Sequence, residues 1–318
     1  MDTKAKKIDW RRWVSNYATL VALVLLIIII AVNRPNFIKP SNLINIFRQA
    51  SIIGLMAVGM TFVVLTGGID LSVGAIFTAA GMFSALTAQN HDLPWIVPVL
   101  AGLAVGLILG FINGIVVAVW RVPAFIATLG MQNLARGIAL QITDAKPVPN
   151  LSQQFQNIGQ ESFLNIPIPV WIMAAVLILT FFLLYQCKYG RYIFAVGGSR
   201  LAAKISGVKV RTVESSAYVI AGLLAALSGI IMTARVSSGI ANAGMGYETD
   251  AIAAVVMGGT SLAGGRGRLW GTVVGFLFMT AMSIGLDMIG LSSPIQLMVK
   301  GVLIVLAVMV DGLAQSDK

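Results

Sequence analysis

Residues 65–74 of this chain read LTGGIDLSVG, and they interrupt a long hydrophobic stretch with a glycine pair and a carboxylate. Such a break is costly in lipid, because backbone polar groups at that depth find no water and must be satisfied by protein or by a water-filled path. The same arrangement returns at residues 262–271, LAGGRGRLWG, with the spacing GG-x5-G intact. Paired interrupted helices in the two halves of a membrane protein indicate a transport pathway.

The composition is that of a membrane protein. Of 318 residues, 58% are hydrophobic and 11% are charged, and the mean hydropathy is +0.89, which excludes an ordinary soluble domain. Because a hydrocarbon core about 30 Å thick needs roughly 20 apolar residues of helix, the sequence predicts an all-α polytopic protein with about ten transmembrane helices, some of them broken. They are expected near residues 18–32, 47–66, 71–88, 95–119, 123–143, 170–186, 215–234, 251–262, 270–286 and 294–310. The eighth is short for a full crossing, so it is expected to be tilted, broken or re-entrant.

Basic residues gather in particular connections between these spans. They are Lys4, Lys6, Lys7, Arg11 and Arg12 before the first span, Arg121 after the fourth, Lys188, Arg191, Arg200, Lys204, Lys209 and Arg211 after the sixth, and Arg266 and Arg268 after the eighth. With an even number of spans, the positive-inside rule places all of them, and both termini, in the cytoplasm. The expected organisation is a cytoplasmic tail at 1–17, one transmembrane domain at 18–311 with a cytoplasmic loop at 187–213, and a cytoplasmic tail at 312–318. Topology thus accounts for the net charge of +10, and no nucleic-acid partner is expected.

The two glycine motifs belong to a longer internal repeat. A constant shift of 197 positions aligns Ala57, Val58, Met60, Leu65, Gly67, Gly68, Gly74 and Met82 with Ala254, Val255, Met257, Leu262, Gly264, Gly265, Gly271 and Met279. Repeats of this kind are common in transporters, which rock one half against the other. The span count makes the copies parallel, whereas a re-entrant segment would make them inverted, and both arrangements stay open.

Catalytic equipment is almost absent from the sequence. The single histidine, His91, stands beside Asp92 in a short predicted external loop, and the single cysteine, Cys187, allows no internal disulfide. No G-x-x-x-x-G-K-[ST] motif is present, so the chain is not expected to bind ATP phosphates through a P-loop. We therefore expect a non-enzymatic chain without a cofactor or metal of its own, for which any ATP is bound by another subunit.

The loop at 187–213 predicts a short cytoplasmic helix. Its expected residues are Ser199, Arg200, Leu201, Lys204, Ile205, Gly207 and Val208. Ser199 can cap the helix and Gly207 can end it, while Gly197 and Gly198 form a lead-in. Leu201, Ile205 and Val208 recur at i, i+4 and i+7, and Arg200 and Lys204 lie off that stripe. An exposed apolar stripe suits docking to a partner protein, and a helix lying on the membrane surface is the alternative.

Polar residues inside two predicted spans are candidates for a substrate path. Thr128, Gln132 and Arg136 recur every four residues and form one stripe of a helix, with Asn133 beside it and Asn113 in the preceding span. The alternative is that these side chains hold helices together, at about 0.6 kcal/mol for each hydrogen bond. For Arg136 a functional role is favoured, because a charge inside the membrane is costly.

The acidic residues near the two breaks have competing explanations. The expected break residues are Gly67, Gly68, Asp70, Gly74, Gly264, Gly265 and Gly271. Asp70 is expected to cap the helix that follows it by accepting a free backbone N–H. Glu248 and Asp250 precede the short eighth segment on the external side, where they can cap it, pair with Arg235 or contact an external binding protein.

Several sequence runs together resemble one known family. They are AVGMT at 57–61, TGGIDLSVG at 66–74, AFIATL at 124–129, GRYI at 190–193 and GYETDAIAAVVMGGTSLAGG at 246–265. These runs look like the permease subunit of ribose-type ABC sugar importers, and the likeness covers almost the whole chain. It implies a multi-pass protein of the bacterial inner membrane, a permease homodimer, a cytoplasmic ABC ATPase and an extracytoplasmic sugar-binding protein. In that arrangement the loop from 197 to 208 would contact the ATPase.

Two other classes of function compete with a sugar-importing ABC permease. An ion-coupled secondary sugar transporter would work alone, but the docking-type helix and the shortage of buried carboxylates for a proton relay speak against it. A membrane-embedded enzyme would need a catalytic constellation, and the sequence offers none.

Overall fold

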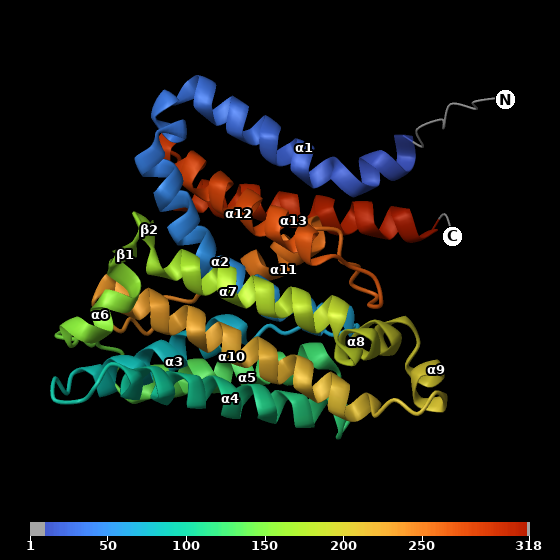
Figure 1. Ribbon diagram of the computed structural model, residues 1–318, viewed down its shortest axis with the longest axis horizontal. Helices are drawn as coiled ribbons and strands as arrows, with labels where there is room; N and C mark the ends of the chain where they lie inside the picture. The colour runs from blue at the N-terminus through green and yellow to red at the C-terminus, as the bar shows by residue number, and fades with distance from the viewer. Residues whose placement is uncertain (1–9, 317–318) are drawn as a thin grey trace.

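Helices make up most of the computed structural model, which describes residues 10–316 (Figure 1). They are α1 (Trp10–Asn33), α2 (Pro40–Leu65), α3 (Val73–Ala88), α4 (Ile96–Ala118), α5 (Ala124–Gln141), α6 (Gln153–Gln160), α7 (Ile168–Phe181), α8 (Lys188–Gly198), α9 (Arg200–Ile205), α10 (Val210–Val236), α11 (Tyr247–Met257), α12 (Leu269–Ile289) and α13 (Ser293–Ser316). A 3-10 turn, η1 (Pro35–Ile38), follows α1, and a π-helical segment, η2 (Phe182–Gln186), extends α7. The strands of the described chain, β1 (Ser162–Phe163) and β2 (Ile166–Pro167), form one small antiparallel hairpin. The expected all-α class is confirmed.

Not every predicted span is a long apolar helix. Among the described residues, five segments are long and apolar enough to cross a bilayer, namely α2, α4, α7 with η2, α10 and α12. Shorter apolar helices cover Thr19–Asn33, Val73–Ala88 and Ser293–Leu306. Helix α11 has 11 residues, so at 1.5 Å per residue it covers about half of the hydrocarbon thickness. The total of ten spans therefore stays a prediction.

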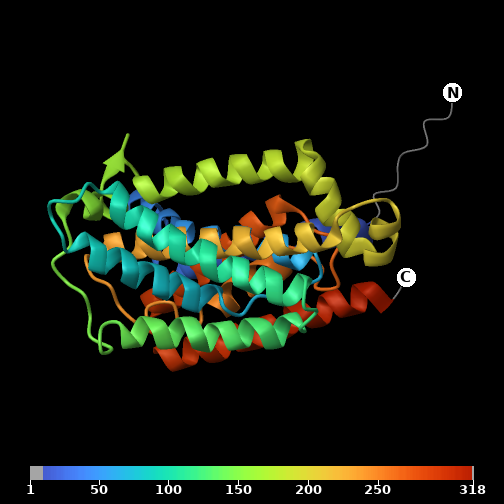
Figure 2. The ribbon, with the colours of Figure 1, turned by 90° about the horizontal axis from the view of Figure 1, so that it is seen from below.

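Both ends of the described chain lie at one end of the molecule. Figures 1 and 2 show the start of α1 and the end of α13 at the same end as α8 and α9. Helix α1 begins at Trp10, inside the tail expected at 1–17, and α13 continues to Ser316, inside the tail expected at 312–318. Lys4, Lys6 and Lys7 lie outside the described residues. The shared end agrees with an even number of crossings, and its cytoplasmic placement remains a prediction.

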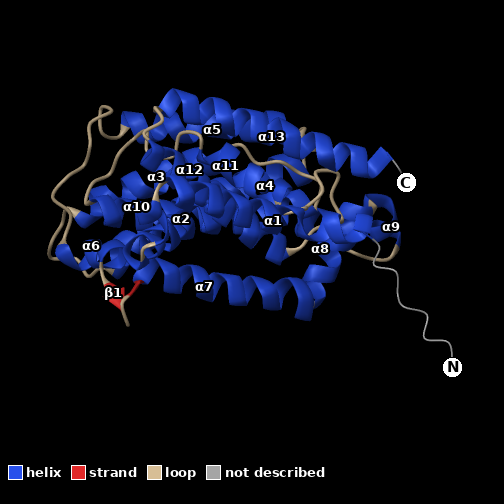
Figure 3. Cartoon of the chain, turned by 90° about the horizontal axis from the view of Figure 1, so that it is seen from above, coloured by secondary structure: helices blue, strands red, loops and turns tan. Residues whose placement is uncertain are grey.

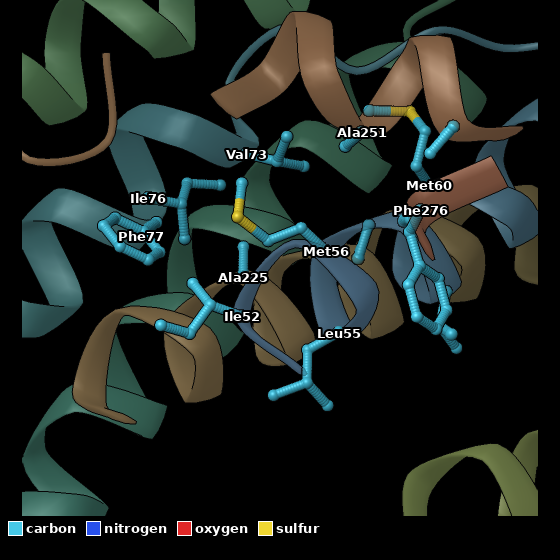
Figure 4. Close-up of a cluster of buried hydrophobic side chains, with 14 of the residues drawn as sticks. Ile52, Leu55, Met56, Met60, Val73, Ile76, Phe77, Ala225, Ala251 and Phe276 are labelled. Carbon is cyan, nitrogen blue, oxygen red and sulfur yellow. The ribbon is translucent and has the colours of Figure 1, made fainter. Parts of the chain in front are cut away.

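Helix α10 stands at the centre of the bundle and packs on α2, α3 and α4. Small residues permit the close approach of α4: a Cβ atom on Gly110 would lie 2.7 Å from the carbonyl oxygen of Tyr218. Most of the buried apolar side chains of the core come from α2, α3, α10, α11 and α12 (Figure 4). In Figures 2 and 3, α5 and α13 cover one face of this core and α7 lies on the opposite face. The most apolar window of α7 with η2 is only 22% buried, against 83% for α2, so α7 is peripheral.

Candidate functional site

The two glycine motifs do interrupt helices, and the two interruptions touch. Helix α2 ends at Leu65 and α3 begins at Val73, while α11 ends at Met257 and α12 begins at Leu269. The amide of Gly265 in the second break donates a 2.9 Å hydrogen bond to the carbonyl oxygen of Leu65, the last residue of α2. Each break thus satisfies backbone that the other one exposes, as a membrane interior requires.

Helix α8 meets both breaks at the same point. A Cβ atom on Gly197 would overlap the carbonyl oxygen of Leu65 and the amide nitrogen of Gly265. A Cβ atom on Gly265 would in turn lie 2.6 Å from the Cα of Gly198, and one on Gly264 would lie 2.9 Å from the Cα of Gly67. We call Gly67, Gly197, Gly198, Gly264 and Gly265 the glycine cluster. Gly197 and Gly198 are the last two residues of α8 and directly precede Ser199, the N-cap of α9. They also make the contact of α8 with the breaks.

Three glycines of this cluster are required by their backbone conformation. The φ angles of Gly67, Gly264 and Gly265 are +80°, +84° and +70°. These values lie in the left-handed region, which glycine adopts without the steric cost that a side chain adds. The GG-x5-G spacing therefore encodes both the turn and the close approach.

Asp70 organises the first break from within. Its side chain is fully buried, and Oδ1 accepts 2.8 Å and 2.6 Å hydrogen bonds from the amide and the hydroxyl of Ser72. Asn113 of α4 donates a 2.8 Å hydrogen bond to the same hydroxyl oxygen. Ser72, rather than Asp70, holds the N-cap position of α3, so Asp70 fixes the turn before the helix instead of capping the helix itself. Asn113 is 1% exposed, and its side chain binds this turn.

The polar stripe of α5 contacts both halves of the repeat. The Thr128 hydroxyl donates to the Ala124 carbonyl at 2.8 Å and lies 3.4 Å from the Ile69 carbonyl of the first break. One turn further on, Gln132 Nε2 donates a 3.1 Å hydrogen bond to Glu248 Oε1 at the start of α11. Arg136 follows Gln132 by one further turn of α5 and is half-buried. Asn133 is exposed.

Glu248 is buried. A contact with an external binding protein was one of the roles expected for it. Glu248 is 8% exposed, and Oε1 also accepts a 3.3 Å hydrogen bond from the amide of Gly246. A Cβ atom on Gly74 of α3 would overlap Oε2, so the glycine of the first motif makes room for this carboxylate. Oε2 is buried without a hydrogen-bond partner. Gly271 of the second motif packs in the same way on the carbonyl of Gly258.

Asp250 pairs with Lys300, a cation that was not among the residues predicted from the sequence. It is 4% exposed and forms a 2.8 Å ion pair with Lys300 of α13. The expected pairing of Glu248 or Asp250 with Arg235 is not found among the described residues. An informative signal was present, because Lys300 lies inside the tenth predicted span and an intramembrane charge needs a partner.

The connection between η2 and α10 contains two helices rather than the expected one. In the second, α9, the Ser199 hydroxyl accepts a 3.3 Å hydrogen bond from the Ala202 amide, and Gly207 ends the turn with φ +83°. Leu201 and Ile205 are 69% and 78% exposed. Arg200 forms an ion pair with Glu214 at the start of α10. Lys204 is exposed and Val208 is half-buried.

Comparison with known protein families matches residues 42–308 to the family described as the permease component of the branched-chain amino acid transport system. The chain belongs to this permease family. The permease is 44% identical over 309 residues to the ribose import permease protein RbsC of Escherichia coli K12, which covers 96% of each chain. It is 43% identical over 317 residues to RbsC of Bacillus subtilis 168, with 98% of this chain and 97% of that protein covered. The resemblance to ribose-type permeases is thus confirmed.

A permease described for a different sugar is also similar. The D-allose transport system permease protein AlsC of Escherichia coli K12 is 36% identical over 312 residues, which is 98% of this permease and 96% of that protein. No solved structure matches the permease.

Proposed function

We propose that this permease is the membrane subunit of an ATP-driven ribose importer in the inner membrane of a bacterium. The observation that carries this proposal is the 44% identity to a ribose import permease over 96% of both chains. The identity to a D-allose permease is lower, at 36%, so ribose is the favoured sugar.

The proposed assembly contains two copies of the permease, a cytoplasmic ABC ATPase that binds ATP, and an external sugar-binding protein. The exposed pair Leu201 and Ile205 on α9 supports docking of the ATPase, because burying two large apolar side chains stabilises an interface. A second copy is supported by the outer face of α5, on which Phe125 and Ile126 are 57% and 60% exposed.

Sugar passage is assigned to the polar contact between α5 and α11. Gln132, Arg136 and Glu248 offer donors and acceptors for sugar hydroxyls next to the two breaks. Thr128 and Asn113 bond to backbone or to the Asp70 turn, so we assign them to the scaffold of the break. Asn133, exposed on α5, remains a candidate for the path or for the contact with a second copy.

In the proposed mechanism, α8 transmits the movement of the ATPase to the helix breaks beside the sugar path. Helix α9 receives the ATPase, and α8 ends on the glycine cluster, where backbone touches backbone without an intervening side chain. A shift of α8 therefore acts on both helix breaks at once. This arrangement suits alternating access, in which one repeat moves against the other.

Reconstitution tests the proposal. The permease, its ATPase and its binding protein are placed in liposomes, and uptake of labelled ribose is measured with and without ATP, with unlabelled D-allose as competitor. We expect uptake that needs ATP and all three proteins and that D-allose inhibits weakly. Ribose uptake driven by an ion gradient without the ATPase would contradict the proposal and favour a secondary transporter.

A further inference from the structure

Two arginines of the described chain lie on neighbouring helices without a carboxylate partner. Arg48 lies in α2 and Arg235 in the last turn of α10, and both are half-buried. Helices α2 and α10 pack on each other, and Gln49, the residue after Arg48, lines the same cavity as Arg235. The ion pairs found in residues 10–316 join other groups, Arg200 with Glu214 and Lys300 with Asp250. Arg48 Nε is, in addition, buried without a hydrogen-bond partner.

A cavity of about 190 Å³ adjoins Arg235. Its lining residues are Gln49, Ile52, Ile53, Met232, Arg235, Val236 and Tyr247. Three of these side chains, Gln49, Arg235 and Tyr247, are polar. The other four are apolar. Because α10 starts next to α9 and Arg235 lies at its far end, the cavity is at the end of the molecule opposite α8 and α9 (Figure 1).

This combination requires a particular kind of ligand. Two guanidinium groups that repel each other in a partly buried place are stabilised by an anion between them, and the free Nε–H needs an acceptor. Guanidinium groups bind phosphate with paired hydrogen bonds. A neutral sugar would leave the repulsion in place. The apolar lining next to the two charges suits a hydrocarbon chain.

We propose that Arg48 and Arg235 bind the phosphate of a membrane phospholipid, whose acyl chain packs against Ile52, Ile53 and Val236. The site lies where helix ends meet the headgroups, in the leaflet opposite α8 and α9. Gln49 and the Tyr247 hydroxyl supply further hydrogen bonds to the headgroup. A lipid held there joins α2 to α10 and stabilises the packing that leads to the first break.

The test uses the full-length permease purified in detergent and depleted of lipid. Phosphatidylglycerol, phosphatidylcholine and inorganic phosphate are titrated separately, and bound lipid and melting temperature are measured by native mass spectrometry and thermal denaturation. The variants are Arg48→Gln, Arg235→Gln and the charge-preserving Arg48→Lys and Arg235→Lys. Arg34→Gln is the matched control, because Arg34 is an exposed arginine that follows α1 at the same end of the molecule.

We expect phosphatidylglycerol to bind and to raise the melting temperature of the unaltered permease. Each glutamine variant should bind it at least about tenfold more weakly, the loss expected for one hydrogen bond to a charged group. The lysine variants keep the charge and should retain part of the binding, which separates lost affinity from misfolding. The Arg34→Gln control should bind as the unaltered permease does.

Three results would overturn the proposal. Lipid binding that is unchanged in both glutamine variants removes the site, and an equal loss in Arg34→Gln shows general attraction to the positive charge of the protein. A stabilisation by inorganic phosphate as large as that by phosphatidylglycerol assigns the arginines to free phosphate instead of lipid.

Discussion

Gly197 of α8 is the residue on which three segments converge. Its Cα faces the Leu65 carbonyl of the first break and the Gly265 amide of the second, with no room for a methyl group. Its neighbour Gly198 has nothing within 4 Å of the position that a Cβ atom would take. The two adjacent glycines therefore offer an experiment in which the same substitution is made with and without a steric conflict.

We expect Gly197→Ala to push α8 away from the breaks and to lower ATP-dependent uptake strongly. Overpacking a close contact typically costs about 1–3 kcal/mol of stability, so the melting temperature should fall as well. Gly198→Ala is the control and should leave uptake and melting temperature nearly unchanged. Equal behaviour of the two variants in uptake and thermal denaturation would show that the contact seen at Gly197 does not matter for transport.

Substitutions at Asp70 and Gln132 distinguish a residue that supports the fold from a residue that lines the sugar path. Asp70→Ala removes two hydrogen bonds and leaves the buried amide of Ser72 without its partner, which costs about 1–3 kcal/mol. Gln132→Ala removes one hydrogen bond to Glu248, typically worth less than about 2 kcal/mol in a membrane. We expect Asp70→Ala to lower thermal stability and uptake together, and Gln132→Ala to lower uptake per folded molecule. A destabilised Gln132→Ala with normal uptake per folded molecule would move the α5 stripe to the scaffold.

At the scale of elements, α9 is short and is held on the bundle at one end. The Arg200–Glu214 ion pair ties it to α10, and its own Ala203 is buried. Its two largest apolar side chains, Leu201 and Ile205, point away from the described chain. Such a helix contributes little to the permease's own core, so its exposed face is free to serve a partner.

Leu201→Asp or Ile205→Asp should abolish binding of the ATPase without unfolding the permease. A charge buried in a protein interface without a partner costs several kcal/mol, whereas the same charge on the free surface is solvated. Lys204→Ala, exposed on the same helix, is the control. Co-purification with the ATPase and thermal stability of the permease are measured for all three variants, and normal co-purification of both aspartate variants would refute the docking role of α9.

An ion pair joins α11 to α13. Lys300→Met leaves Asp250 as an unpaired charge in a buried place, and breaking a buried pair costs about 3–5 kcal/mol. The double variant Lys300→Met with Asp250→Asn removes that charge and should recover much of the lost stability. Thermal denaturation of the single and double variants forms a double-mutant cycle, and additive effects would show that the two residues do not interact.

At the scale of the whole molecule, the permease has a buried centre and two unlike outer faces. The central helices α2 and α10 carry the core, and α7 covers one face loosely (Figures 2 and 3). Helices α5 and α13 lie on the opposite face, where Figure 1 shows them apart from each other. The polar contacts Gln132–Glu248 and Asp250–Lys300 both involve the face formed by α5 and α13. A second copy placed on this face would bring two such polar sites together.

The isolated permease is expected neither to bind nor to hydrolyse ATP. Its sequence contains no G-x-x-x-x-G-K-[ST] motif that would wrap the phosphates. Binding of a fluorescent ATP analogue and release of phosphate are measured for the purified chain, with the complete complex as the positive control. Hydrolysis by the chain alone, in proportion to its concentration, would contradict a division of labour between subunits.

The membrane class, the positions of both helix breaks and the cap and stop of α9 were predictable from the amino-acid sequence. These properties depend on hydrophobicity, on glycine conformation and on neighbours within a few residues. Each of these can be read from a short stretch of sequence. The sequence also determined the family, through runs that extend along almost the whole chain.

Which of these local features meet follows from the folded arrangement of the helices and was not predictable from the sequence. Leu65 and Gly265 are 200 positions apart, yet they share a hydrogen bond, and Gly197 packs on both. Glu248 and Asp250 read as external residues in the sequence because their partners, Gln132 and Lys300, belong to other predicted spans. Whether a carboxylate can be buried depends on a donor or cation supplied by another helix, and hydrophobic periodicity along one helix carries no information about that donor.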